Sequence, residues 1–204
     1  MGRPITSPAR RAQIVDAMLR VMSARGSERA SIAAIADAAE LTPGLVHYHF
    51  RNKQEVLLAL LERLELIIGE RVERFEAGAT SPRKRLAAFL DAYLARDPDA
   101  RPEAVACWVA LGTEALTRPE VGAAYRALVE RQIGALESRV RAVLDDEGGD
   151  VARAPAIASG LFAAIEGAFR LATIAPGVIP QGSAASTLRA MTEGLLGQNE
   201  EDSA

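Results

Sequence analysis

SIAAIADAAELTPGLVHYHFRNK, residues 31–53, combines two short helical patterns with a tight break between them. Ser31 is a suitable N-cap for a first helix over residues 32–39, in which apolar residues recur on one face. Thr42 is a suitable N-cap for a second helix over residues 43–49. Because helices of two turns are not stable alone in water, both must pack on a larger element. The stretch therefore predicts a pair of short helices joined at an angle.

The second of these helices carries residue types suited to contact with DNA. Gly44 allows the backbone to approach a phosphate or a groove wall closely, and Leu45 can contact a thymine methyl group. Tyr48 and His49 place hydrogen-bonding groups on rigid rings. An alternative is that Gly44 and the proline before it only shape the turn. We interpret the pair as a helix-turn-helix over about residues 31–50.

The same stretch resembles the N-terminal DNA-binding domain of the TetR family of transcriptional regulators, over roughly residues 10–61. The resemblance is carried by a Thr-Pro-Gly sequence and by the pattern x-Tyr-His-Phe-x-x-Lys, which ends at Lys53. The family very often has Tyr where this sequence has His47. The resemblance implies a regulator whose second short helix contacts the bases of its operator. The residues expected to contact DNA are Ser31, Thr42, Pro43, Gly44, Leu45, His47, Tyr48, His49 and Lys53.

The charge of the chain is unevenly distributed. The net charge is −3, which by itself argues against a nucleic-acid partner. Residues 1–53, however, contain eight basic and four acidic residues, a local charge of +4 that leaves −7 for residues 54–204. A basic end on an acidic body is typical of a protein that binds double-stranded DNA with that end. The segment Met1–Thr6 is either an unstructured end or an arm that reaches the DNA backbone or minor groove.

Helical patterns occupy most of the remaining chain, and we find no convincing strand. Residues 8–25 predict a helix that braces the two short ones, and a long amphipathic helix is expected from Lys53 to about Ala77. Further helices are expected over about residues 82–95, 102–116, 119–147 and 155–174 and after Ser183. The sequence thus predicts an all-α fold. Its expected parts are an N-terminal three-helix DNA-binding domain over residues 1–53 and a larger C-terminal helical domain, for ligand binding and dimerisation, over residues 54–204.

Several classes of function have no support in the sequence. We find no paired carboxylates, nucleophile motif or glycine-rich phosphate loop, so we expect no enzyme activity and no cofactor. His47 and His49 point roughly 200° apart on a helix, so we expect no metal site there. No apolar run reaches the roughly 20 residues of a membrane span, so we expect no membrane partner. A single cysteine, Cys107, and no signal peptide at the start of the chain are expected of a cytoplasmic protein.

A stripe of small residues marks the helix expected over residues 155–174. Gly160, Ala164 and Gly167 fall at spacings of four and three, which lets another helix approach closely. That neighbour is either a helix of the same subunit or one of a second copy. The resemblance to TetR proteins implies a homodimer in which this helix pairs with the last helix. The expected dimer seam is Gly160, Ala164, Gly167, Leu188, Met191 and Leu195.

Two helices of the C-terminal domain combine large apolar groups with a rare carboxylate. Glu114 follows Cys107 and Trp108 on one helix, and Glu166 lies between aromatic residues on the other. Such a carboxylate is either at the solvent edge or faces a ligand, because burial without a partner is costly. Aromatic walls with a carboxylate suit an apolar ligand that has a cationic centre or a hydrogen-bond donor. The expected ligand-binding residues are Cys107, Trp108, Glu114, Phe162, Glu166 and Phe169.

Residues 108–144 and 160–196 also faintly resemble the C-terminal domain of the BetI-type branch of the same family. Together these features predict a dimeric TetR-type repressor that binds a palindromic operator and is released by a small-molecule effector. The alternative is a helical small-molecule carrier whose N-terminal helices do not bind DNA. The local charge of +4 and the Tyr48/His49 pair favour the DNA-binding interpretation.

Overall fold

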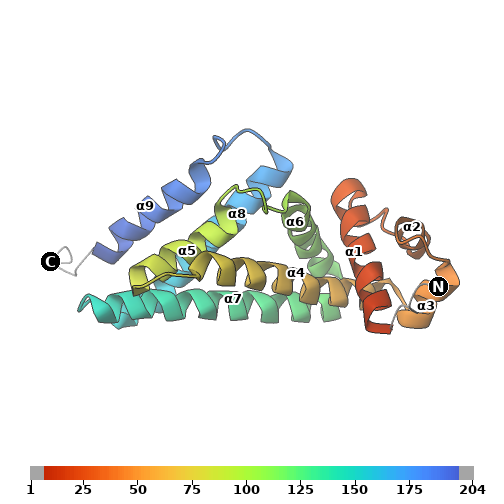
Figure 1. The fold of residues 1–204 in the computed structure, drawn as a ribbon, viewed down its shortest axis with the longest axis horizontal. Coiled ribbons are helices and arrows are strands. Elements are labelled where there is room, and N and C mark those ends of the chain that lie inside the picture. The colour runs from red at the N-terminus through yellow and green to blue at the C-terminus, as the bar shows by residue number, and fades with distance from the viewer. Residues whose placement is uncertain (1–6, 198–204) are drawn as a thin grey trace. The chain divides into compact units, whose positions relative to one another are not determined.

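The computed structural model describes residues 7–197, within which the chain forms nine α-helices, one short 3-10 helix and no strand (Figure 1). The helices are α1 (Ser7–Arg25), α2 (Ile32–Ala38), α3 (Pro43–His49), α4 (Lys53–Glu76), α5 (Pro82–Leu94), α6 (Pro102–Thr117), α7 (Pro119–Asp146), η1 (Val151–Arg153), α8 (Ala154–Ile174) and α9 (Ser183–Gly197). The prediction of an all-α fold is confirmed. The proposed arm, residues 1–6, and the end of the chain, residues 198–204, lie outside the described residues.

Side-chain caps begin the two short helices, as the sequence predicts. Ser31 Oγ accepts a hydrogen bond from the Ala34 N–H at 3.1 Å, and Thr42 Oγ1 accepts one from the Leu45 N–H at 3.3 Å. Each cap satisfies one of the N–H groups that the first turn of a helix leaves without a backbone partner. Helix α3 has the predicted bounds, Pro43–His49.

Packing divides the chain into two compact units. Among the described residues, unit 1 contains residues 7–66 and 101–128, and unit 2 contains residues 67–100 and 129–197. This division differs from the boundary expected at residue 53, because α6 and the first part of α7 pack with the N-terminal helices. Helices α4 and α7 each contribute residues to both units.

Helix α1 is the centre of unit 1, and it packs against α2, α3 and α6. Its buried residues surround the helix and do not form a single stripe: they are Ile14, Val15, Ala17, Met18, Leu19, Val21 and Met22. The Sγ–H of Cys107 in α6 donates a hydrogen bond to the carbonyl of Leu19 at 3.3 Å. Helix α6 thus covers the part of α1 that α2 and α3 leave uncovered, which explains why it belongs to this unit.

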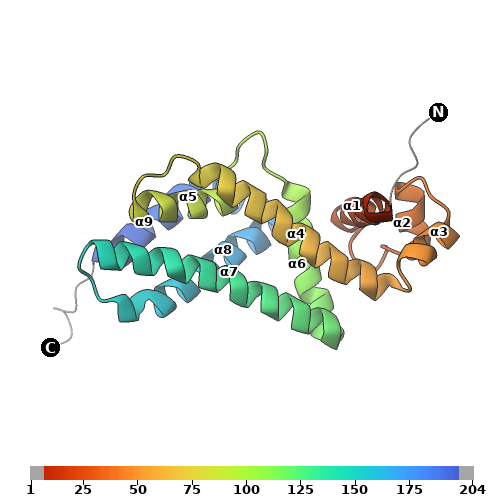
Figure 2. The same cartoon turned by 60° about the horizontal axis from the view of Figure 1, so that its bottom comes forward.

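Unit 2 has a hydrophobic core of its own, built from α5, α8, α9 and the parts of α4 and α7 that belong to it (Figure 2). Its surface carries ion pairs between helices. Arg83 at the start of α5 pairs with Glu147 at 2.5 Å and also with Glu193 in α9. Arg189 in α9 pairs with Asp91 in α5. These pairs join α9 to α5 at two points, 8 residues apart along α5, and so fix how α9 lies along it.

One helical segment, Val151–Ile174, is long and apolar enough to cross a membrane by length and composition alone. This corrects the expectation that no part of the chain reaches that length and apolar character. The segment nevertheless includes Glu166 and Arg170, and one face of α8 is buried in the core of unit 2 through residues such as Leu161 and Ile165. Its apolar content is therefore explained by the packing of a helical bundle together with the small residues of its other face.

Candidate nucleic-acid interface

The turn between α2 and α3 depends on Glu40, whose backbone has the left-handed conformation with φ at 55°. The Glu40 N–H donates to the Asp37 carbonyl at 3.0 Å, and the Leu41 N–H donates to the Ala36 carbonyl at 2.8 Å. These two bonds close the C-terminal end of α2 and reverse the chain toward the next helix. Helices α2 and α3 therefore contact each other directly, as a helix-turn-helix requires.

Side chains of α1 bind the C-terminal end of α2. Gln13 Nε2 donates to the Ala39 carbonyl at 2.7 Å, and Arg20 Nη2 donates to the Ala38 carbonyl at 2.7 Å. The last carbonyl groups of a helix have no partner within it, and the helix dipole makes that end negative. Donors from α1, one of them cationic, therefore fix α2 at the end from which α3 departs.

The end of α3 is held in the same way. Arg11 donates a hydrogen bond to the carbonyl of His49, and its guanidinium carbon lies 4.0 Å from the centre of the Phe50 ring. Val46 and Phe50 are almost fully buried. The expected packing of Phe50 in the core is confirmed, and α3 is thus fixed at its buried face and at its last residue.

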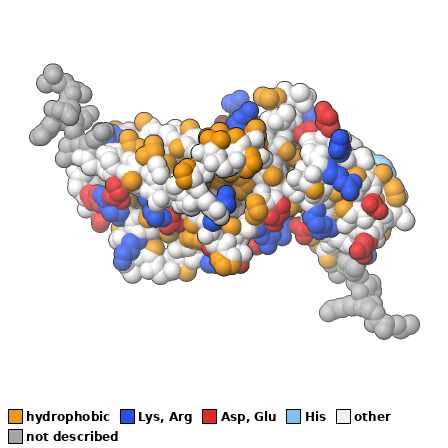
Figure 3. All heavy atoms as spheres, turned by 90° about the horizontal axis from the view of Figure 1, so that it is seen from above, with side chains coloured by type: hydrophobic (Ala, Val, Ile, Leu, Met, Phe, Trp, Pro, Cys, Tyr) orange, Lys and Arg blue, Asp and Glu red, His pale blue; other side chains and the backbone are white. Residues whose placement is uncertain are grey.

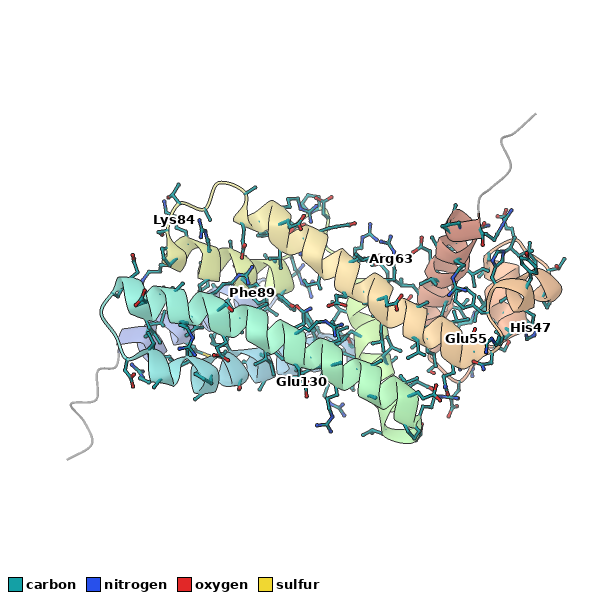
Figure 4. The ribbon with its side chains drawn as sticks, turned by 90° about the horizontal axis from the view of Figure 1, so that it is seen from below. His47, Glu55, Arg63, Lys84, Phe89 and Glu130 are labelled. Carbon is teal, nitrogen blue, oxygen red and sulfur yellow. The ribbon has the colours of Figure 1, made fainter. Side chains whose placement is uncertain are left out.

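The opposite side of α3 faces solvent. Tyr48 is 82% exposed, and its ring contacts that of His49 edge to face, with ring centroids 5.0 Å apart and planes at 88°. His47 is exposed on the outer side of α3, whereas His49 is half-buried (Figure 4). Four more of the residues expected to contact DNA are exposed: Ser31, Thr42, Pro43 and Gly44. Leu45, in the first turn of α3, is half-buried.

Many basic residues of the N-terminal segment are used inside unit 1. Arg11 and Arg20 bind helix ends, and Arg51, although its side chain is 90% exposed, lies 3.4 Å from Glu55. The local charge of +4 therefore overstates the number of cations that can contact phosphate. Arg25 and Arg29 are exposed beside the turn that leads into α2, which makes them candidates that sequence reasoning missed.

Lys53, the first residue of α4, belongs to a polar cluster with Ser27, Glu114 and Arg118, which we call the Glu114 cluster. Lys53 Nζ donates to the Ser27 carbonyl at 2.6 Å. Ser27 Oγ donates to the Glu114 carboxylate, which also accepts a hydrogen bond from Arg118 Nε at 2.5 Å. Burial lowers the pKa of Lys53, and the negative charges of Glu114 and Glu28 only partly oppose this. Sequence reasoning missed the cluster because its members come from distant segments.

The expected dimer seam is partly at the surface of unit 2. Gly160 and Gly167 are exposed, and a Cβ atom added at either would meet open space. Met191 is 53% exposed. Ala164 and Leu195 are half-buried against the core, and Leu188 lies inside the core at 4% exposure. Leu188 therefore has little surface left for a second copy.

Further apolar side chains extend this surface, and sequence reasoning missed them. Leu171 and Ile174 are exposed near the end of α8, and Val178 is exposed in the loop that follows. Figure 3 shows hydrophobic side chains gathered over the region of α9 and the end of α8. Exposed apolar side chains that gather in one region are of the kind that marks an interface between proteins.

Three of the expected ligand-binding residues lie in unit 1, within α6. Cys107 is fully buried against α1, and burial raises the pKa of its thiol to about 12. Trp108 stacks on Tyr125 of α7, with ring centroids 4.4 Å apart. Glu114 belongs to the Glu114 cluster defined above. The buried thiol therefore packs as part of the core, and the buried Trp108 forms with Tyr125 an aromatic stack that the sequence did not reveal.

The other three expected ligand-binding residues lie in unit 2, on α8. Phe162 is buried and Phe169 is half-buried, and the ring of each has its centroid 6.2 Å from that of Tyr93. The Tyr93 hydroxyl donates to the amide oxygen of Gln132. Glu166, on the same helix, is half-buried. Unit 2 thus contains an aromatic cluster with polar groups beside it, and the six expected residues form two sets, one in each unit.

Two protein-family models match most of the described chain, with residues 61–81 between the two matches. Residues 82–197 match the family model described as "BetI-type transcriptional repressor, C-terminal". Residues 14–60 match the model described as "Bacterial regulatory proteins, tetR family". The second match includes α2, α3 and the turn between them, and the first includes Glu114 and both aromatic sets.

Individual relatives are similar over different lengths. The HTH-type transcriptional regulator BetI of Rhizobium meliloti (strain 1021) is 36% identical over 115 residues, which span 56% of each protein. BetI of Brucella anthropi is 27% identical over 162 residues, 79% of this chain and 80% of that protein. A transcriptional regulator from Rhodococcus sp. Rha1 has a TM-score of 0.79 at 23% identity, with 91% and 95% of the two chains covered. A regulator from Saccharomonospora viridis, solved in complex with choline, has a TM-score of 0.76 at 22% identity, with 95% and 98% covered.

Proposed function

The chain belongs to the TetR family of transcriptional regulators, and from this premise we propose that it is a homodimeric repressor of a palindromic operator, released by a small molecule. The family consists of DNA-binding regulators and not of enzymes. Its members bind operator DNA as dimers and bind small-molecule effectors. The carrier that does not bind DNA has no comparable support.

The observation that carries the proposal is the exposure of Tyr48. Its neighbours Val46 and Phe50 fill the core of unit 1, whereas the Tyr48 ring, at 82% exposure, contributes almost nothing to that core. A rigid ring with a hydroxyl at its tip suits contact with base edges and phosphates in a major groove. We therefore assign α3 as the recognition helix, with Tyr48 at the centre of its DNA-facing side.

The remaining contacts follow from the position of α3. Pro43 and Gly44 at its start are exposed and bring the backbone close to the groove, and Leu45 beside them can contact a thymine methyl group. Ser31 and Thr42 lie at helix starts, where N–H groups favour phosphate. We assign the exposed His47 and the half-buried His49 to contacts with the operator on either side of Tyr48, and Arg25 and Arg29 to contacts with the DNA backbone.

We test DNA binding by footprinting the purified protein on the DNA that flanks its own gene. A dimer that places two recognition helices in successive major grooves protects two half-sites about 34–36 Å apart on a palindrome. Affinity should also fall steeply as salt rises, because phosphate contacts release counterions. Absence of any palindromic footprint, or an affinity independent of salt, would contradict the proposal.

For the effector we propose a small molecule with a cationic centre, bound at the aromatic cluster of unit 2. Tyr93, Phe162 and Phe169 provide aromatic faces, and Glu166 places a carboxylate on the same helix as two of them. Aromatic faces attract cations through the negative charge above the ring. The Saccharomonospora viridis regulator, which shares the fold, was solved with choline, a quaternary ammonium. Choline is therefore the first probe.

The effector is tested with choline and with 3,3-dimethylbutan-1-ol, which has the same shape without the charge. We expect choline to raise the melting temperature and to weaken operator binding, and the neutral analogue to do neither. Complete release would require about 5.5 kcal/mol of preference between two states, so partial release is expected. Phe169→Ala and Glu166→Gln should weaken choline binding. Normal choline binding by both variants would place the site elsewhere. In that case, a change in the fluorescence of Trp108, the single tryptophan of the sequence, when choline is added would point to unit 1.

The cytoplasm is the compartment that this function requires, because a regulator must reach its operator. We therefore propose a cytoplasmic protein, in line with the family of bacterial regulatory proteins to which it belongs. Fractionation of cells that express the tagged chain tests this, and we expect to recover the chain in the cytoplasmic fraction. Recovery in the membrane fraction would contradict it and would direct attention to the apolar segment Val151–Ile174.

A further inference from the structure

The turn that leads into α2 is held by a side chain from α4. Within this turn, Ser27 to Ala30, the Ala30 N–H donates to the Ser27 carbonyl at 3.1 Å. The same carbonyl accepts the hydrogen bond from Lys53 Nζ at 2.6 Å. The residue after the turn is Ser31, the N-cap of α2. The direction in which α2 leaves the turn, and with it the placement of α3, therefore depends on a carbonyl that Lys53 holds.

Glu114 completes this arrangement from α6. Its side chain is only 13% exposed, and its carboxylate accepts hydrogen bonds from Ser27 Oγ and from Arg118 Nε. Hydrogen bonds from Ser27 and Arg118 and the charges of Lys53 and Arg118 outweigh the effect of burial, so the pKa of Glu114 lies below its usual range. The carboxylate is thus the only acidic member of a cluster with two cations, and it touches the turn itself.

We infer that Glu114 is a positioning residue for operator binding, which acts through Ser27 and Lys53 on the turn before α2. This inference rests on the proposed function, since it concerns how well the recognition unit is placed on DNA. Glu114 lies within the segment that matches the C-terminal family model, whereas Ser27 and Lys53 lie within the segment that matches the N-terminal one. The contact therefore joins α6 to the helix-turn-helix at one named residue.

The electrostatics give this role a distinctive signature. A carboxylate near DNA repels phosphate. If Glu114 acted only through its negative charge, its removal should therefore raise the affinity for every DNA sequence. If Glu114 positions the turn, its loss should instead weaken binding to the operator while binding to unrelated DNA does not weaken. The two explanations thus predict opposite changes in operator affinity for the same substitution.

The test compares three variants with the wild type by fluorescence anisotropy on an operator duplex and a scrambled duplex. Glu114→Gln keeps an acceptor for Ser27 Oγ but loses the charge, and Glu114→Ala loses both. Glu120→Gln is the matched control, because Glu120 carries the same charge, is exposed, and accepts its hydrogen bond from Gln54 and not from the turn before α2. We expect operator affinity to fall about tenfold for Glu114→Ala, less for Glu114→Gln, and not at all for Glu120→Gln.

Circular dichroism and urea unfolding of each variant accompany these titrations. The inference predicts that the ratio of operator to scrambled affinity falls at a temperature where helicity is unchanged. A ratio unchanged within twofold for both Glu114 variants would overturn it, as would a fall in the ratio that occurs only when helicity is lost. If the wild type itself binds no operator, the proposed function fails first, and this outcome is distinct from a wild type that binds and variants that bind equally well.

Discussion

The guanidinium carbon of Arg11 lies 4.0 Å from the centre of the Phe50 ring, and Arg11 also donates a hydrogen bond to the carbonyl of His49. The Arg11 side chain, from α1, therefore covers the buried ring of Phe50 and also binds the C-terminal end of α3. Because Tyr48 precedes His49, the direction of the exposed tyrosine depends on this contact. Arg11, which the sequence analysis counts toward the charge available for DNA, thus belongs to the scaffold that holds α3 in place.

Arg11→Ala should destabilise unit 1 by about 1–2 kcal/mol, through the loss of a hydrogen bond to a helix end and of the contact with an aromatic ring. It should also lower the preference for operator over scrambled DNA. Urea unfolding and anisotropy titrations measure the two effects. Arg29→Ala is the control: it should leave stability within about 0.5 kcal/mol and weaken both duplexes alike. Equal behaviour of the two variants would refute the assignment of Arg11 to the scaffold.

Glu40→Gly should stabilise the protein by about 1 kcal/mol, because glycine adopts the left-handed conformation without the steric cost that a side chain carries. Glu40 has φ at 55° and is exposed. The urea midpoint measures the change. Glu28→Gly removes the same side chain from another exposed turn position without a positive φ, and it should not stabilise. A lower midpoint for Glu40→Gly would show that the turn is not strained.

Gly167→Leu should convert the dimer to a monomer without unfolding the subunit. Gly167 is exposed, and a Cβ atom added there meets no described atom within 4 Å, so we expect the added side chain to clash with a second copy and not with its own subunit. Overpacking typically costs about 1–3 kcal/mol per site, and two symmetric sites are affected. Gly134→Leu, on the exposed side of α7, also meets open space and should remain dimeric. Light scattering at low protein concentration measures the molar mass of each variant. A Gly167→Leu variant that remains a dimer would show that the dimer interface lies elsewhere.

Stability should fall in acid partly through Asp97. The hydrogen bond from Arg71 lowers the pKa of Asp97, and burial opposes this only in part. Because the pKa is lower in the folded state, the stability that Asp97 contributes is complete at neutral pH. It is lost as pH falls from the usual aspartate range near 4 through the lowered value. Asp97→Asn should therefore destabilise more at pH 7 than at pH 3.

The control for this pH dependence is Asp99→Asn, since Asp99 pairs with Arg74 at 2.6 Å on an exposed surface. Exposed ion pairs contribute about 0–1 kcal/mol, so this variant should change little at either pH. Urea unfolding at both pH values measures the differences. An Asp97→Asn variant whose cost is the same at pH 7 and pH 3 would contradict the role of the Arg71–Asp97 pair.

The parts of the fold that the sequence predicts well are those set by neighbours in the chain. Ser31 and Thr42 cap the helices that follow them because a cap and its N–H partner are three residues apart. Glycine and proline mark most helix ends for the same reason, and α3 has its predicted bounds. Such local signals also predict an all-α protein with a helix-turn-helix near residue 31.

The rest depends on pairs that lie far apart in the sequence. The hydrogen bond from Ser27 to Glu114 joins residues that are 87 positions apart, and no local pattern indicates it. The same is true of the packing of α6 on α1, which places residues 101–128 in unit 1 and not in the expected C-terminal domain. Leu188 shows a third case, because its apolar stripe indicated burial but not whether the core or a second copy buries it.

The central claim, that α3 reads an operator with Tyr48, is tested most directly by the ratio of dissociation constants for scrambled and operator DNA. We measure this ratio at one fixed salt concentration for the wild type, Tyr48→Ala and Leu116→Ala. Leu116 is 84% exposed on α6 and so controls for loss of an exposed apolar side chain. We predict a large ratio for the wild type and Leu116→Ala, and a ratio about tenfold or more smaller for Tyr48→Ala. Equal ratios for all three proteins would contradict the assignment of α3 as the recognition helix.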